Sequence, residues 1–124
     1  MPSQIETIMT ADESGKEMVK FAKDTADRLF RDRLNRTQIR NIFTEVRQIE
    51  DMWPDDEAGA MLRLNMLKPK LFYQKNRKKE VAYLEEVLTK AIGFVEDADS
   101  ELRTKRFQRF VYLFEAILAY HRGR

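Results

Sequence analysis

The sequence is dominated by apolar residues that recur every three or four positions, a spacing that places them on one face of an α-helix. The clearest stretch contains Ile39, Ile42, Phe43, Val46 and Ile49. Only four glycines and three prolines interrupt the 124 residues, and no run alternates β-branched with polar residues. Because an antiparallel sheet needs frequent turns and such alternation, the chain is predicted to be all-α.

Five helices are expected in a single-domain bundle, over about residues 12–30, 35–53, 54–67, 79–95 and 100–121. Residues 1–11 lack a sustained period and are expected to be a flexible N-terminus, which leaves residues 12–124 as the helical-bundle domain. The last helix is apolar on most sides between Val111 and Tyr120. Such a helix is surrounded by others, so it is predicted to lie at the centre of the bundle.

Three positions carry specific signals for where helices begin or end. Asn35 with Gln38 three positions later matches the start of a helix with a reciprocal cap. Pro54 is expected in a first helical turn, followed by three acids that favour the positive end of a helix dipole. Pro69 disfavours helical geometry at Lys68 and is predicted to break or kink the chain there.

Composition restricts the classes of protein further. The chain has no cysteine, so it can form neither a disulfide framework nor a thiolate metal site. The N-terminus has no basic segment followed by an apolar stretch, and the most apolar run is much shorter than a membrane span. The protein is therefore expected to be cytoplasmic.

Charges are nearly balanced but unevenly distributed. The chain has 23 lysines and arginines against 21 acids, yet residues 68–79 contain six cations and no acid. The acids gather at residues 55–57 and 96–101. This segregation suits a polyanion on one surface and a protein neighbour on another.

No arrangement of residues predicts catalysis or a bound metal or other cofactor. His121 is the one histidine, and its position on an apolar helix face favours a hydrogen-bonded packing role. Asp97, Asp99 and Glu101 are spaced like the start of a calcium loop, but Leu102 stands where that loop requires glycine. The chain is therefore predicted not to be an enzyme.

Two groups of cations are candidates for nucleic-acid binding. Residues 68–79 interleave Phe72 and Tyr73 with the six cations, a mixture that can pair phosphates and stack on a base or ribose. On the second helix, Arg36, Arg40 and Arg47 lie within about 40° of each other at 100° per residue. Both groups could equally be solvated surface charge paired with nearby acids.

Three segments resemble a known family. They are residues 37–40, residues 67–73 ahead of Arg77, and Arg106 with Phe107 followed by residues 110–121. The three segments, in this order along the chain, are similar to the small subunit of type III-A CRISPR effector complexes, the Csm small subunit. The matches span residues 35–121, and Phe114 to His121 is the most specific part.

The resemblance implies a non-catalytic subunit of an antiviral ribonucleoprotein. It implies association with other effector-complex subunits, self-association in several copies, and contact with the backbones of guide RNA and target RNA regardless of sequence. The residues expected to bind RNA are first Arg40, Lys68, Lys70 and Arg77, within the matched segments, and then Arg36, Arg47, Tyr73, Lys78, Lys79 and Arg106.

Two alternatives remain open at this point. One is a helical DNA-binding regulator that uses the second and third helices as a helix-turn-helix, although the acids at residues 55–57 would then begin the recognition helix. The other is a purely structural adaptor whose cations pair with acids of neighbouring proteins.

Overall fold

The computed structural model describes residues 4–122. Six α-helices and one 3₁₀-helix make up this part of the chain, and it contains no strand. They are α1 (Gln4–Thr10), α2 (Lys16–Arg31), α3 (Arg36–Met52), α4 (Glu57–Arg77), η1 (Lys79–Val81), α5 (Ala82–Glu96) and α6 (Ser100–Tyr120). The predicted all-α class is confirmed, with one more α-helix than expected.

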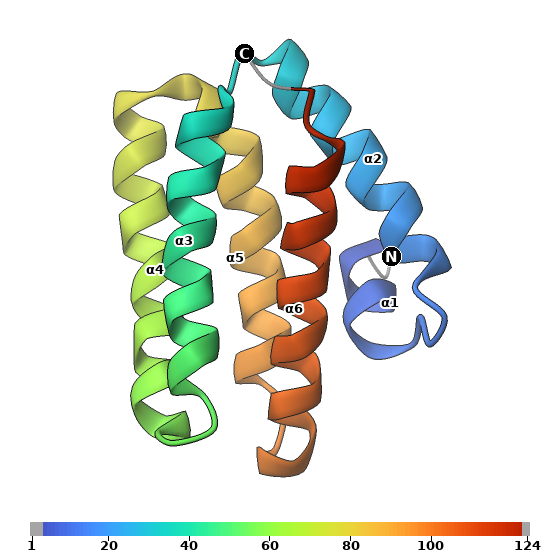
Figure 1. Ribbon diagram of the computed structural model, residues 1–124, viewed down its shortest axis with the longest axis vertical. Helices are drawn as coiled ribbons and strands as arrows, with labels where there is room; N and C mark the ends of the chain where they lie inside the picture. Colours follow the sequence, from blue (N-terminus) through green and yellow to red (C-terminus); the bar gives the residue numbers. More distant parts are fainter. Residues whose placement is uncertain (1–3, 123–124) are drawn as a thin grey trace.

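Helices α3, α4, α5 and α6 lie side by side, and α2 crosses at an incline beyond α6 (Figure 1). The C-terminal helix α6 packs against α1, α2, α3 and α5, which confirms its predicted central position. Helix α4 lies at the opposite edge and packs against α3 and α5. One side of α4 therefore faces away from the bundle.

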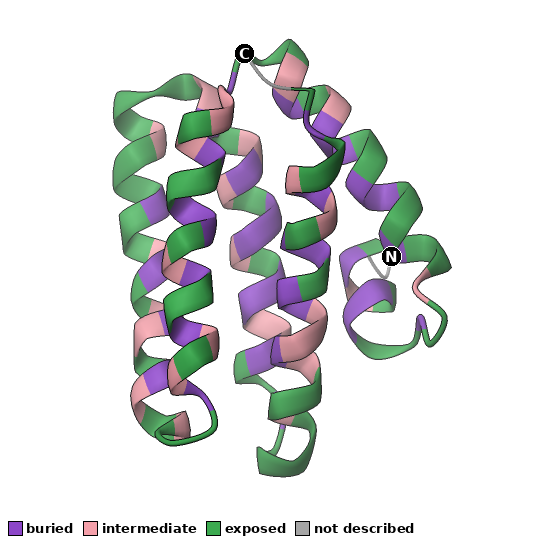
Figure 2. Cartoon of the chain, in the orientation of Figure 1, coloured by how far each residue is buried: buried purple, intermediate pink, exposed green. Residues whose placement is uncertain are grey.

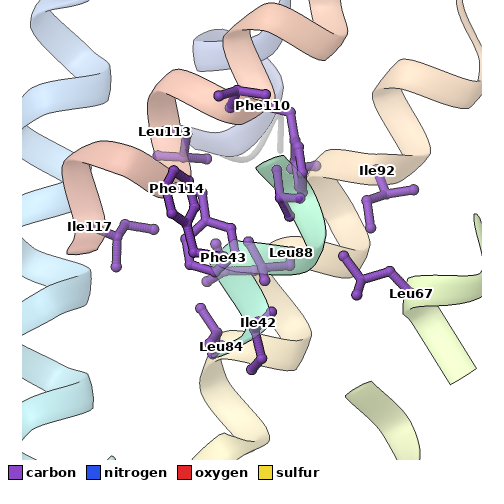
Figure 3. Packing of buried hydrophobic residues seen from close by; sticks show 14 of the residues in the cluster. Ile42, Phe43, Leu67, Leu84, Leu88, Ile92, Phe110, Leu113, Phe114 and Ile117 are labelled. Carbon is purple, nitrogen blue, oxygen red and sulfur yellow. The ribbon is translucent and has the colours of Figure 1, made fainter. Parts of the chain in front are cut away.

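The core is one cluster of buried side chains from every α-helix. Figure 2 shows buried positions along the helices, and Figure 3 shows the packing of core residues from α3, α4, α5 and α6. The Phe43 and Phe114 rings meet edge to face with centroids 5.0 Å apart. The Trp53 and Phe107 rings stack with centroids 4.1 Å apart, and the Trp53 indole donates a hydrogen bond of 3.0 Å to the Thr104 hydroxyl. Burial of such side chains stabilises the bundle by about 1.5–3 kcal/mol each.

The predicted cap at Asn35 is confirmed. The Gln38 backbone N–H donates to Asn35 Oδ1 at 2.8 Å, and the Asn35 N–H donates to Gln38 Oε1 at 2.9 Å. The two bonds satisfy donors that the first turn of α3 leaves without helical partners. The cap thereby places the N-terminus of α3 at the residue that the sequence indicated.

Residues 4–10 form a helix, although the sequence was expected to have no regular structure there. Ile5, Ile8 and Met9 are buried, and the Arg109 Nε donates to the Ile8 carbonyl at 2.6 Å. A helix of seven residues is too short to be stable alone or to show a clear period, so its stability comes from tertiary packing.

Pro69 was predicted to break or kink the chain, and a break is wrong, because α4 continues through Pro69 to Arg77. Pro69 is exposed, whereas Leu64, Leu67 and Leu71 around it are buried. A proline in a helix interior costs about 3 kcal/mol, and burial of three leucines offsets more than that. The basic segment therefore lies on helices α4 and η1.

The expectation for Pro54 is also corrected: it lies in the turn before α4, whose N-cap is Asp56.

Within residues 4–122, no helix combines the length and the apolar character needed to cross a bilayer.

Candidate nucleic-acid interface

A groove runs between α3 and α4, and it collects part of the predicted basic surface. We call it the α3–α4 groove. Buried Ile42, Leu67 and Leu71 contribute apolar side chains to it. The remaining lining residues are Gln38, Asn41, Glu45, Lys70, Tyr73, Gln74, Arg77, Lys78 and Val81. Four of the ten residues predicted to bind RNA are among them.

Helical spacing explains why these α4 residues share a surface. Lys70, Gln74 and Arg77 are separated by four and three positions and so fall on one side of α4. That side is next to the buried face and turns toward α3. The cations at the end of α4 also interact favourably with the negative end of its dipole. The position of Arg77 and Lys78 therefore agrees with the local electrostatics of the helix.

Lys70 is partly neutralised by the acid that lines the groove. Its Nζ lies 3.0 Å from Glu45 Oε1, and the Arg63 guanidinium contacts the other carboxylate oxygen. The hydrogen bond from Lys70, together with the Arg63 contact, holds the pKa of Glu45 below its ordinary value against the effect of burial. Glu45 thus stays charged and is shared between two cations.

Tyr73 and Arg77 form an exposed pair at the rim. Tyr73 is 60% exposed, and Arg77 NH1 donates to its hydroxyl at 2.8 Å. The guanidinium carbon lies 5.7 Å from the ring centroid, within the range of a cation–π contact. Between residues 4 and 122, no carboxylate forms an ion pair with Arg77 or Lys78. Their charges are therefore available to an anion.

The three predicted arginines of α3 lie on its other side, next to α6. Arg36 NH1 donates to the His121 carbonyl at 2.8 Å. Arg47 pairs with Glu50 at 2.8 Å and with Glu115 of α6 at 2.6 Å. Arg40, one helical turn from Arg36, is exposed, and its side chain has no ion pair in the described part of the chain. The predicted cations of α3 therefore lie on a different surface from those of the groove.

The last three predicted residues lie outside the groove. Lys68 Nζ is 3.6 Å from Glu96 on the α5 side of α4. Arg106 is half-buried and donates to the Phe94 carbonyl at 2.9 Å, a contact that joins α6 to α5. Lys79 is exposed in η1, next to Lys78. Of the three, only Lys79 continues the basic end of the groove.

Sequence reasoning did not identify the amides that line the groove. Gln38 and Asn41 on α3 face Gln74 on α4 across it. The Gln38 amide also donates to Glu80 at 3.1 Å, and this hydrogen bond lowers the pKa of Glu80. Amides can donate to phosphate or ribose oxygens without selecting a base. The sequence analysis named Gln38 as the cap partner of Asn35 and did not single out Asn41 or Gln74.

His121 has the packing role that its sequence position predicted. It is 2% exposed, and its Nε2 lies 2.8 Å from the Leu34 carbonyl oxygen. Over the described range, no group of three or more His, Cys, Asp or Glu residues is arranged to hold a metal ion.

Comparison with protein families matches residues 12–124 to a model described as Csm2 Type III-A. Neither a curated protein nor a solved structure matches the chain.

Proposed function

Because the chain belongs to the Csm2 family of type III-A CRISPR systems, we propose that it is the non-catalytic small subunit of an effector ribonucleoprotein. In this role it binds the backbones of guide and target RNA without reading their sequence. It lies beside the backbone subunits in several copies and contributes to antiviral defence. The observation that carries the proposal is the α3–α4 groove, where Arg77 and Lys78 lie beside exposed Tyr73 and, within residues 4–122, form no ion pair with a carboxylate.

The chemistry of the groove fits a ribose-phosphate chain. Arg77 and Lys78 supply charges for phosphates, and the neighbouring amides can donate to phosphate or sugar oxygens. Tyr73 presents an aromatic face on which a base or ribose can stack regardless of its identity. Contacts of this type suit a subunit whose sequence specificity comes from base pairing in the RNA.

Lys70 joins these contacts by exchanging its partner. When a phosphate approaches Lys70, Glu45 keeps Arg63 as a counter-ion. The carboxylate therefore does not become unpaired when Lys70 turns to the RNA. Retention of one cation lowers the energetic cost of the exchange.

We assign a second, smaller RNA contact to Arg40 on the α6 side of α3. Lys79 extends the basic end of the groove beyond Lys78. Arg36, Arg47, Lys68 and Arg106 have partners within the bundle. We rank these four below the groove residues, because binding RNA would require each of them to give up an existing contact.

The test compares two triple variants in the assembled effector complex. The groove variant carries Lys70→Ala, Arg77→Ala and Lys78→Ala. The control carries Lys16→Ala, Lys20→Ala and Lys23→Ala, which remove the same charge from exposed positions of α2. The measured quantity is the slope of the logarithm of the RNA-binding constant against the logarithm of salt concentration. If each groove cation contacts a phosphate, this slope should become less steep by about two to three units in the groove variant alone.

Two outcomes would reject the proposal. An unchanged slope in the groove variant would favour the structural adaptor, in which these cations meet acids of neighbouring subunits. Preference of the chain for duplex DNA of defined sequence would favour the DNA-binding regulator. The second outcome is disfavoured by the side-by-side course of α3 and α4 (Figure 1), since the helices of a helix-turn-helix cross at about 90–120°.

A further inference from the structure

The α3–α4 groove has an apolar floor and a charged rim. Ile42 of α3 and Leu67 and Leu71 of α4 line the floor and are 6%, 3% and 1% exposed. Arg77 and Lys78 lie at the exposed rim. An ionised phosphate is unsuited to the floor, because it would lose its hydration there without gaining a partner. A ligand that fills the whole groove therefore carries charge on one part and an uncharged, largely apolar group on another.

Contacts between side chains close the groove at both ends. Lys70 pairs with Glu45 at 3.0 Å at one end, and the Gln38 amide donates to Glu80 at 3.1 Å near the other. Gln38 and Glu45 are separated along α3 by about 10 Å at 1.5 Å per residue. The groove has a volume of about 370 Å³, near the lower limit for pockets that hold a small molecule. It is therefore suited to one planar ring system rather than to a helix or a duplex.

Two amides in the groove have unused hydrogen-bonding capacity. Gln38 already has two partners, whereas the side-chain amides of Asn41 and Gln74 have no hydrogen-bond partner among residues 4–122. Each amide offers both a donor and an acceptor, so it can pair with the polar edge of a purine or of a pyrimidine. Tyr73 adds an exposed ring beside them, and an aromatic ring stacks on the face of any base.

We propose that the α3–α4 groove receives one unpaired base of the bound RNA, while Arg77 and Lys78 hold an adjacent phosphate. The base lies between the apolar floor and the Tyr73 ring, and its polar edge meets Asn41 and Gln74. Bases within a duplex are already stacked and paired, so the ligand is an unpaired nucleotide. Because both amides can donate or accept, the site takes any of the four bases.

This inference rests on the proposed binding of RNA in the groove and extends it. A site for the ribose-phosphate backbone alone needs cations and hydrogen-bond donors but no apolar floor. The two proposals therefore differ in a measurable way: backbone binding depends on the phosphates, whereas base capture also depends on the presence of the base.

The first experiment compares two ligands that differ in their bases but not in their charge. The full-length chain is titrated at low salt, where backbone binding is strongest, with a short single-stranded RNA and with an abasic strand of the same length. Both strands carry the same number of phosphates. We expect the RNA to bind at least about fivefold more tightly, which is the lower limit for stacking one base on an aromatic side chain.

Substitutions at Tyr73 test whether the groove causes this difference. Tyr73→Ala removes the ring and should make the two strands bind equally. Tyr73→Phe keeps the ring and loses only the hydroxyl that accepts from Arg77, so the difference should remain. Tyr112→Ala is the matched control, because Tyr112 is 52% exposed on α6, away from the groove. Circular dichroism checks that all variants keep the helical content of the parent.

A double variant tests the contacts to the edge of the base. Asn41→Leu with Gln74→Leu removes both amides from exposed positions and leaves the charge of the groove unchanged. Binding of the RNA should weaken at least about threefold, because the polar edge of the base loses its partners. Binding of the abasic strand should not change.

Each result supports or overturns base capture. Equal affinity of the parent chain for both strands overturns it and would leave the floor to an apolar side chain of a neighbouring protein. A difference that survives Tyr73→Ala, or that Tyr73→Phe or Tyr112→Ala abolishes, also overturns it. So does an equal loss of affinity for both strands in the double variant.

Failure of base capture can be told apart from failure of the proposed function. If the two strands bind equally while the groove variant still makes the salt dependence less steep in the assembled complex, backbone binding stands and only the base site is rejected. If neither strand binds the chain, base capture is rejected, and the salt measurement on the complex decides the proposed function by itself.

Discussion

Replacement of Pro69 by alanine should stabilise the protein. Pro69 is the thirteenth residue of the α4 range Glu57–Arg77 and therefore lies in the helix interior. Proline has no N–H to donate to the Asn65 carbonyl four residues earlier, and its ring crowds that carbonyl. Pro69→Ala restores the donor and removes the crowding. Because Pro69 is exposed, the change opens no cavity in the core.

The magnitude follows from these contacts. In helix interiors proline is about 3 kcal/mol less favourable than alanine. Packing of the buried leucines has already adapted α4 to the proline, so part of that difference is not recovered. We expect the free energy of unfolding to rise by about 1–3 kcal/mol. For a chain of this size, the melting temperature should rise by about 4–12 °C.

Urea and thermal denaturation followed by circular dichroism measure the effect on the isolated chain. Lys20→Ala is the control: it exchanges one strong helix former for another at an exposed position of α2, so the free energy should change by less than about 0.5 kcal/mol. A loss of stability in Pro69→Ala would refute the reasoning. It would mean that the proline ring stabilises α4 more than the missing hydrogen bond weakens it.

Two further predictions concern a backbone conformation and a titrating group. Gly15 has φ of 82°, and a Cβ added there would have no atom within 4 Å. Gly15→Ala should therefore lower the free energy of unfolding in urea by about 1–2 kcal/mol through backbone strain alone, and an unchanged value would contradict this. The lowered pKa of Glu45 implies stability that is present above its ordinary pKa of 4.5 and is lost as pH falls through the folded value. Glu45→Gln should reduce the loss of unfolding free energy at acid pH, measured by urea titration. A pH profile identical to that of the parent would show that the contacts with Lys70 and Arg63 add nothing to stability.

The helices that the sequence predicted well have a wide apolar face and a local cap. Helix α3 is the clearest case, because Asn35 and Gln38 satisfy each other's backbone donors within four residues. The family was also recognisable from short segments along the chain. Signals of this kind are local, and they do not depend on how the helices pack.

The positions of the predicted binding residues could not be obtained in the same way. Arg36 and Arg77 were both expected to bind RNA, yet Arg36 bonds to the carbonyl of His121 at the end of α6, while Arg77 bonds to the exposed Tyr73 at the groove rim. Lys68 and Lys70 are two residues apart but pair with acids of different helices. A sequence shows which cations are present, whereas their partners come from helices that are distant along the chain.

The sequence alone determined the all-α class, the central C-terminal helix and the membership of the family, because hydrophobic period and motif order are properties of the chain itself. Only the tertiary structure decided that α4 continues through Pro69, that residues 4–10 form a helix, and that the basic residues lie on separate surfaces. The physical reason is the same in all three cases. Burial against distant helices outweighs local preference, and it sets which side of each helix stays exposed.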